Sequence, residues 1–382
     1  MQNPFKYGKE VTGYQFFDRR EAAEELYAHL HDGSTNVVLY APRRYGKTSL
    51  VLRVLERFQL EKTRCLHFDM SKIASLEKFC EVYAAAVYSL FGGVPDLANR
   101  IATYLAHLHP TFSLSLKGAT VRFDYGDRMT ETSVAEVLDL PEKLAKDAGL
   151  CRVVIALDEF QEIAALSKDM PLEAVFRSVI QSHQVARYVF LGSKTHLMKR
   201  MFGAVSRPFY KSALTMKIGK PPADESEEFI VSRYAAEGIA IASAEAKRIV
   251  EVSENIPYYL QAVAGLAFRP VERRRGQSVE QSDIDSAVAR LEEAGEDLYE
   301  EMLSNLSAAQ RALVEALAEE PTDKFDEAYR RRHAFDNAST LHSAQRELVR
   351  RGILETDKTR SFVGDPFFAR YIRHSSAARV LI

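Results

Sequence analysis

The chain has 382 residues, more than the roughly 100 to 200 of an ordinary domain, so we expect two or three domains. The composition, 46% hydrophobic and 27% charged, is that of a globular protein, and no stretch approaches the ~18 consecutive apolar residues of a membrane span. A net charge of −2 excludes a general attraction to nucleic acid and leaves only a local basic surface for such binding.

The first eight residues contain no apolar run behind a basic start. A secretory signal peptide needs both features. We therefore expect a cytoplasmic protein with no membrane partner.

The first part of the chain alternates between strand and helix patterns. Helical spacing predicts a helix at 19–31, and the apolar run at 37–40 predicts a buried strand that leads into a helix at 48–58. A strand at 63–70 and a helix at 76–90 continue the pattern. Strands and helices in this order predict an open, doubly wound α/β sheet.

Residues 92–132 interrupt this alternation. After a helix, the segments 112–116 and 121–125 alternate apolar and polar residues around Lys117 and Gly118, which predicts an amphipathic hairpin inserted in the core. The sheet pattern then resumes with expected helices at 134–147, 172–184 and 195–202 and strands at 153–157, 188–191 and 215–218. A break at Lys220-Pro-Pro222 ends this predicted core domain, residues 1–222.

The rest of the chain is mainly helical. Residues 223–304 are predicted to form an all-α domain with helices at 224–236, 243–253, 257–268 and 280–303. Residues 305–382 follow another plan, with helices at 307–319, 325–333 and 338–351, two short strands around 358–360 and a final helix. Three helices followed by a two-stranded wing predict a winged helix-turn-helix domain.

A phosphate-binding loop lies between the strand at 37–40 and the helix after it. The segment Ala41-Pro42-Arg43-Arg44-Tyr45-Gly46-Lys47-Thr48-Ser49 matches G-x-x-x-x-G-K-[ST] at every element except the first glycine. Backbone N–H groups of such a loop bind polyphosphate oxygens, so we expect ATP or ADP here. Lys47 would reach the β and γ phosphates, and the Thr48 hydroxyl would ligate Mg²⁺.

Two carboxylates follow the most apolar strand, 153–157. Asp158 is expected to be the second Mg²⁺ partner, and Glu159 is expected to polarise the attacking water as general base. Ser193, after the next strand, is read either as a γ-phosphate sensor or as the cap of the following helix. Arg207 is read either as an arginine finger or sensor or as a solvated side chain.

Residues on both sides of the phosphate loop carry a resemblance to a known family. The start Asn3-Pro-Phe-Lys-Tyr-Gly8, then Phe16-Phe17-Asp-Arg19-Arg-Glu21, then 42–50, resembles the archaeal-type ATPases of the STAND branch of AAA+ proteins. The resemblance implies an AAA+-like core, helical domain and winged helix, with Phe17 and Arg19 on the adenine side. Glu254-Asn255-Ile-Pro257 is similar to the family's Gly-x-Pro motif, whose proline packs on nucleotide in a closed, ADP-like state; the alternative is a simple helix-start proline.

Basic residues gather in the predicted winged helix. Arg346 and Arg350 share a face of the helix at 338–351, and Lys358 and Arg360 form the expected wing tip, so DNA could be bound there. Yet residues 307–382 hold 13 Lys and Arg against 11 Asp and Glu, which favours slightly a regulatory or protein-docking module.

Two functions therefore stay open. The first is an ATP-hydrolysing conformational switch or signalling regulator that acts on an unidentified protein partner. The second is a DNA-associated ATPase of the replication-initiator kind, which shares the same order of domains.

Overall fold

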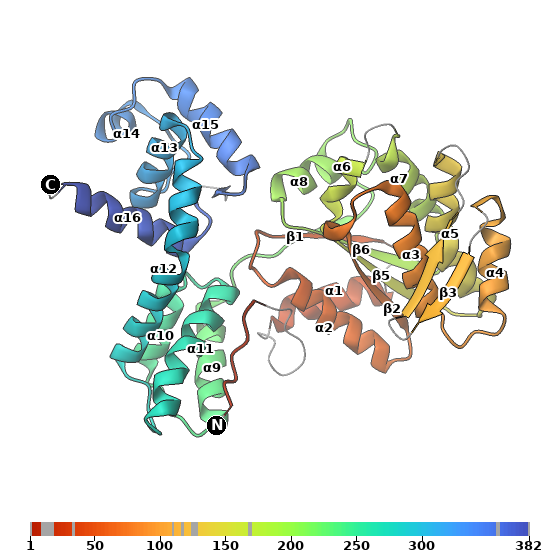
Figure 1. Cartoon of the computed structure of the whole chain (residues 1–382), viewed down its shortest axis with the longest axis horizontal. Coiled ribbons are helices and arrows are strands. Elements are labelled where there is room, and N and C mark those ends of the chain that lie inside the picture. Colours follow the sequence, from red (N-terminus) through yellow and green to blue (C-terminus); the bar gives the residue numbers. More distant parts are fainter. Residues whose placement is uncertain are drawn as a thin grey trace. The chain divides into compact units, whose positions relative to one another are not determined.

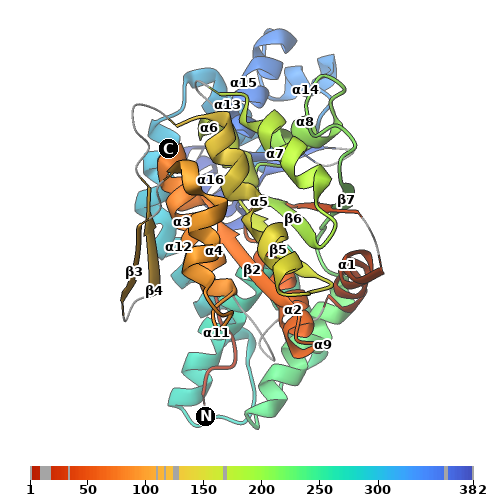
Figure 2. The same cartoon turned by 90° about the vertical axis from the view of Figure 1, so that its right-hand side faces the viewer.

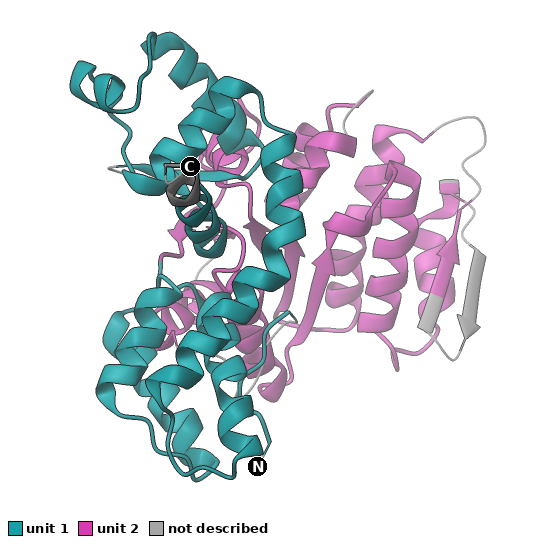
Figure 3. Ribbon diagram, turned by 60° about the vertical axis from the view of Figure 1, so that its left-hand side comes forward, with its two compact units in different colours: residues 1–11, 220–382 teal, residues 12–219 magenta. Residues whose placement is uncertain are grey.

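The computed structural model describes residues 2–8, 19–32, 35–108, 111–115, 118–123, 129–166, 170–356 and 360–380. The chain divides into two compact units (Figure 3). One, Thr12–Gly219, is called the sheet unit below, and the other, Met1–Val11 with Lys220–Ile382, the helical unit. The division into three domains at residues 222 and 304 stays a prediction.

A parallel sheet of five strands forms the centre of the sheet unit (Figure 1). Its strands, in spatial order, are β2 (Arg64–Asp69), β5 (Val153–Asp158), β6 (Ala186–Gly192), β1 (Val37–Tyr40) and β7 (Leu214–Lys217). All five lie where the sequence predicts strands. The order places β6 between the strand that leads into the phosphate loop and the strand that ends in Asp158.

The central strands are apolar on both faces because helices cover both faces. Successive side chains of β1 point to opposite faces, and Val37, Val38 and Leu39 are all fully buried. Helices α1 and α2 lie on one side of the sheet, and α3, α5 and α7 lie on the other (Figures 1 and 2). The helices of this unit are α1 (Arg20–Asp32), α2 (Lys47–Leu60), α3 (Leu76–Leu90), α4 (Leu97–Tyr104), α5 (Glu131–Asp147), α6 (Ile163–Leu166), α7 (Leu172–Ser182) and α8 (Thr195–Gly203).

The predicted hairpin is present as β3 (Thr111–Ser115) and β4 (Gly118–Arg122), paired antiparallel. Its second strand begins at Gly118 instead of residue 121, while residues 124–125 of the prediction lie outside the described residues. Val121 of β4 is buried in the main core, so the hairpin is anchored to the sheet unit by an apolar side chain.

The helical unit contains α9 (Ala223–Ala236), α10 (Ser243–Val252), α11 (Pro257–Arg273) and α12 (Gln281–Ser304). Its main departure from the sequence prediction is the end of α11, which continues five residues past 268 and includes Pro270. A proline inside a helix loses one backbone hydrogen bond. Val271 is fully buried, and burying this further apolar side chain favours continuing the helix.

The first residues of the chain pack on these helices. Asn3 donates its side-chain amide to the Gly265 carbonyl at 2.8 Å, and the Lys6 backbone N–H donates to Gln261 Oε1 at 3.0 Å. The Phe5 ring lies 5.0 Å from the Tyr234 ring, centroid to centroid. A Cβ on Gly265 would lie 3.2 Å from Phe5 Cβ, so glycine permits this close approach.

The last part of the chain has the predicted winged-helix order. Helices α13 (Ala308–Glu319), α14 (Glu327–Arg332) and α15 (Ala338–Arg350) are followed by the antiparallel pair β8 (Leu354–Thr356) and β9 (Ser361–Val363), and then by α16 (Pro366–Val380). Among the described residues, no helix combines the length and apolar character needed to cross a membrane.

Candidate nucleotide site

The loop between β1 and α2 has the backbone of a phosphate cradle. Gly46 has a φ of 80° and Arg44 a φ of 69°, both in the left-handed region, whereas Ala41 is not among the residues with positive φ. Glycine accepts this conformation readily, and a non-glycine residue there is strained and common at functional sites. Alanine at the loop entrance is therefore compatible with the turn.

Lys47 begins α2 and is buried, and its Nζ donates to the Pro42 carbonyl across the loop at 3.3 Å. The cation is thus held over the loop's interior, where the phosphates of a nucleotide would lie. The helix N-terminus adds partial positive charge at the same place.

Arg19, which the resemblance assigns to the adenine side, is buried and donates to two backbone carbonyls. One guanidinium nitrogen donates to the Tyr45 carbonyl at 2.9 Å, and the other donates to the Gly219 carbonyl at 2.8 Å. Gly219 is the last residue of the sheet unit. One side chain therefore joins the phosphate loop to the point where the chain leaves this unit.

Thr48 and Asp158 meet, although 110 residues separate them in the sequence. The Thr48 hydroxyl donates to Asp158 Oδ2 at 2.7 Å, and His67 Nε2 lies 3.1 Å from the same oxygen. Burial of Asp158 favours its neutral form, but the hydrogen bonds from His67 and Thr48 outweigh this and lower the pKa of Asp158 below its ordinary value. The carboxylate is therefore kept ionised, as a cation ligand must be.

Glu159 and Ser193 also come together. The Ser193 hydroxyl donates to Glu159 Oε2 at 2.7 Å, and the Gln161 amide donates to the same oxygen. The interpretation of Ser193 as a helix cap is wrong, because the cap position of α8 is Lys194 and no side chain caps that end. Glu159 itself has a φ of 50°, a left-handed backbone that a strained functional position tolerates.

Gly192, at the end of β6, makes room for this arrangement. A Cβ there would lie 2.6 Å from Gln161 Oε1 and 2.3 Å from Met198 Cγ, far inside contact distance. A side chain here would force Met198 and the end of Gln161 to shift, and Gln161 is one of the two groups that hold Glu159.

The remaining predicted residues are less closely tied to this cluster. Arg207 forms an ion pair with Glu173 of α7, and no described hydrogen bond joins it to the phosphate loop. Pro257 is buried at the first position of α11 in the helical unit. Asn255, two residues before it, has a φ of 56°. Arg43 and Arg44 are exposed on the loop, Ser49 is half-buried, and Phe17 lies outside the described residues. Their nucleotide contacts stay predictions.

Sequence reasoning missed His67 and Gln161. The position of His67 follows from sheet order, because β2 pairs with β5 in a register that sets Asp69 opposite Asp158, and His67 is two residues before Asp69 on the same face. A histidine in a strand does not by itself predict a contact with a carboxylate on another strand. Nothing in the sequence predicts the contact of Gln161 with Glu159.

Comparisons with known proteins find relatives of the fold. Residues 297–374 match a family described as a probable winged helix domain. The Walker-type ATPase of Pyrococcus abyssi is 18% identical, with a TM-score of 0.67 over 97% of this chain and 99% of that chain. The ORC2 protein of Aeropyrum pernix in its ADPNP–ADP complexes is 13% identical, with a TM-score of 0.58 over 99% of this chain and 100% of that chain. No curated protein matches the sequence.

The chain therefore shares its fold with these two proteins. A parallel sheet with a phosphate loop, a helical region and a winged helix follow one another along the chain, as the sequence predicts. The ADP form of the same ORC2 protein shares this fold at 12% identity, with a TM-score of 0.53 over 97% of each chain. Membership of the AAA+ proteins, and of their STAND branch, stays a prediction.

Proposed function

We propose that this chain binds and hydrolyses ATP and uses the nucleotide to control its conformation as a switch or signalling regulator. The observation that carries the proposal is the 2.7 Å contact between the Thr48 hydroxyl and Asp158 Oδ2. This contact joins the phosphate loop to the carboxylate that follows β5. The sequence predicts these two motifs independently of each other.

The phosphates would be bound by the loop's backbone and by Lys47. The positive φ of Gly46 and Arg44 suits a loop whose successive N–H groups would bind phosphate oxygens, and Lys47 supplies a buried cation. Charge-assisted hydrogen bonds to phosphate are roughly twice as strong as hydrogen bonds between neutral groups.

The residues present also fit Mg²⁺. A hydroxyl and an ionised, buried carboxylate are hard oxygen donors, and Mg²⁺ is usually held by one or two such groups together with substrate phosphates. Thr48 and Asp158 would hold the ion, which when bound supplies charge neutralisation for the phosphate oxygens. His67 would orient Asp158 as an outer partner.

Glu159 would accept a proton from the attacking water. Ser193 and Gln161 both donate to one of its oxygens, which fixes the direction of the carboxylate. Positioning of this kind matters because a general base acts only within hydrogen-bond reach of the proton that it takes.

The chain connections support the switch. The sheet unit is joined to the helical unit after Val11 and after Gly219, and Arg19 binds the carbonyl of Gly219 as well as that of Tyr45 in the phosphate loop. On the helical side, the Asn255 amide donates to the Pro221 carbonyl at 2.7 Å. A change in the phosphate loop therefore has a short hydrogen-bonded route to the connection between the units.

Replacing Asp158 by Asn tests the proposal. ATP affinity should rise with Mg²⁺ in the wild type, and Asp158→Asn should lose that gain together with hydrolysis while keeping its metal-free ATP affinity. Asp69→Asn is the matched control, because Asp69 ends the neighbouring strand in register with Asp158 but caps the Ser71 N–H instead. Equal Mg²⁺ dependence in Asp158→Asn and the wild type would contradict the proposal.

One observation favours the DNA-binding alternative. On α15, five polar residues lie on the exposed face opposite the buried Leu341 and Leu348: Ser339, His342, Ser343, Arg346 and Arg350. However, Glu347 binds Arg350 through two hydrogen bonds, of 2.7 and 2.6 Å, and Glu320 binds Arg332 and His333, so much of the basic charge is already neutralised. The switch therefore remains the first proposal.

Salt-dependent DNA binding separates the two functions. Were DNA the ligand, Arg346→Glu with Arg350→Glu would abolish binding, while Arg331→Glu on α14, where Arg331 pairs with Glu327, would change it little. Lys358 of the predicted wing tip lies outside the described residues, and Arg360 lines a cavity with Lys220. We expect no salt-dependent DNA binding by the wild type.

A further inference from the structure

A second polar pocket lies in the sheet unit, at the opposite ends of the strands from the phosphate loop. Its lining includes Asn36, immediately before β1, and Arg187, near the start of β6. The phosphate loop follows the other end of β1. Four residues of strand span about 13 Å, so the two sites are separate.

The lining of this pocket is basic. Arg177 from α7, Arg187 from β6 and Lys211 from the segment before β7 all line it, and none of the described residues that line it is acidic. The Nε atom of Arg177 is buried with no hydrogen-bond partner among the described residues. A buried donor without a hydrogen-bond partner is costly, and it is the positive charge of the three lining cations that favours an anionic ligand.

The walls of the pocket are held firmly. The Asn36 side-chain oxygen accepts from the Tyr188 N–H at 2.9 Å, and the Asn36 backbone carbonyl accepts from the Leu214 N–H at 2.8 Å. This one residue therefore connects the starts of β1, β6 and β7. Phe190 and Phe209 are buried and form its apolar side. A preformed wall lowers the entropic cost of binding.

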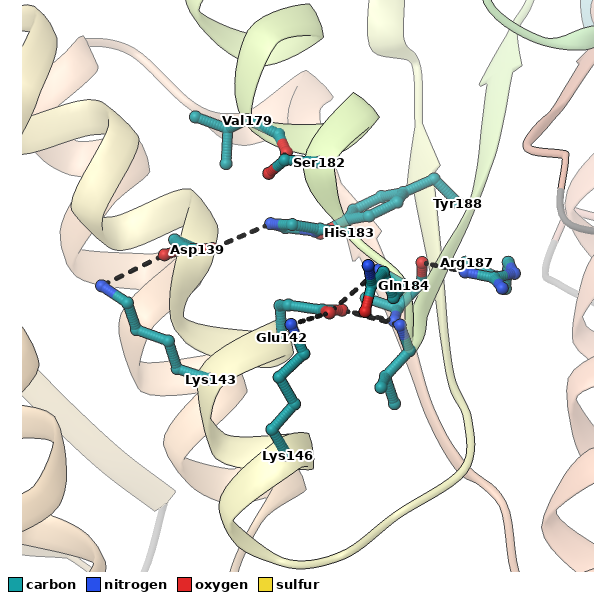
Figure 4. A network of polar contacts seen from close by, with 12 residues as sticks. Asp139, Glu142, Lys143, Lys146, Val179, Ser182, His183, Gln184, Arg187 and Tyr188 are labelled. Atoms are coloured by element: carbon teal, nitrogen blue, oxygen red, sulfur yellow. Dashed lines mark hydrogen bonds and ion pairs between the residues drawn. The ribbon is translucent and has the colours of Figure 1, made fainter.

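Figure 4 shows how the segment before β6 is fixed beside the pocket. Glu142 of α5 accepts three backbone N–H groups, those of Gln184, Val185 and Ala186, at 2.8 to 2.9 Å. His183, which lines the pocket, lies between Asp139 at 3.0 Å and the Tyr188 hydroxyl at 3.1 Å.

We propose that this pocket is a binding site for a small anion of the phosphate class, distinct from the nucleotide site. Its volume of about 200 Å³ is below the roughly 300 Å³ at which pockets for drug-sized ligands begin, so the ligand is small. One guanidinium group can bind two phosphate oxygens at once. Three cations suit a compact ligand with several negative charges.

Calorimetric titration with inorganic pyrophosphate tests this site in full-length protein saturated with ADP. One pyrophosphate should bind per chain, and Arg177→Gln and Lys211→Gln should each weaken it at least tenfold while leaving ADP affinity unchanged. Lys211 is exposed, so its variant should fold normally. Lys143→Gln is the matched control, because Lys143 pairs with Asp139 nearby but does not line the pocket (Figure 4).

Three outcomes would overturn the proposal. The first is no pyrophosphate binding by ADP-saturated protein, and the second is binding that neither pocket variant weakens. The third is loss of pyrophosphate binding in Lys47→Ala, which would place the anion in the phosphate loop. Citrate serves as the comparison, and tighter binding of citrate than of pyrophosphate would contradict the phosphate class.

Discussion

Glu159 is held by two donors and lies one residue beyond the carboxylate that meets Thr48. Its role as general base predicts that Glu159→Gln keeps nucleotide affinity and lowers the rate of hydrolysis by roughly 100-fold or more, because the amide keeps the size of the side chain but cannot take a proton. Single-turnover hydrolysis and ATP titration measure the two quantities separately.

Glu162→Gln is the control for that experiment. Glu162 lies three residues further along, pairs with Lys194 at 2.8 Å and takes only a longer hydrogen bond, of 3.3 Å, from Gln161, so its loss should lower hydrolysis far less than the loss of Glu159. Wild-type hydrolysis in Glu159→Gln would assign the base to another residue.

The site residues that belong to a sequence motif could be predicted from the sequence. The residues that only position another side chain could not. The phosphate loop and Asp158 follow from residue type, spacing and a strand before each. His67 reaches Asp158 only because β2 lies beside β5, and the bond between Ser193 and Glu159 depends on β6 lying next to β5. Predicting such pairs requires the order of the strands in the sheet. The local pattern of apolar and polar residues does not contain that order.

At the scale of elements, Glu142 anchors α5 to the start of β6. Burial raises its pKa, but hydrogen bonds from the backbone of residues 184–186 and from Lys146 outweigh that effect and hold the pKa of Glu142 below its ordinary value of about 4.5. The stabilisation is therefore complete above the unfolded-state pKa and is lost as the pH falls through the lower folded-state pKa.

We predict that Glu142→Gln lowers the free energy of unfolding by about 2 to 4 kcal/mol at pH 7, because an amide NH₂ would face backbone N–H donors. Denaturant unfolding at pH 7 and at pH 3 measures the effect, and the difference from the wild type should shrink at pH 3. Glu131→Gln, at an exposed position of the same helix, should change little. An equal loss in both variants would rule out the anchoring role.

The elements themselves were largely predictable, because buried parallel strands are short apolar runs and the helices between them have apolar residues at helical spacing. The start of β4 was placed three residues too late, since the predicted strand was set by alternation and not by where pairing with β3 begins. The end of α11 was placed too early, because Pro270 signals a stop that the burial of Val271 outweighs.

At the scale of the whole molecule, the switch requires that ADP favour one arrangement of the two units, which it can do only through contacts that differ between arrangements. The resemblance assigns one such contact to Pro257. We predict that Pro257→Ala speeds ADP dissociation about fivefold, as expected for a lost contact of about 1 kcal/mol, and slows the bond-breaking step less.

Dissociation of ADP and single-turnover hydrolysis should be measured side by side, with small-angle scattering to follow compactness. Pro366→Ala is the matched control, because Pro366 is also a buried helix-start proline of the helical unit. Identical ADP dissociation and scattering in Pro257→Ala and the wild type would leave Pro257 as a helix-start residue and remove the argument for the switch.

The central claim, that the phosphate loop binds nucleotide, is tested most directly by calorimetric titration of ATP with Mg²⁺ into the wild type and Lys47→Ala. Lys47 is buried, begins α2 and lies across the loop from the Pro42 carbonyl. The account predicts one nucleotide per wild-type chain and an affinity loss of roughly 100-fold in Lys47→Ala, as expected when a charge-assisted contact of about 3 kcal/mol is removed. Equal ATP affinity in the two proteins would contradict it.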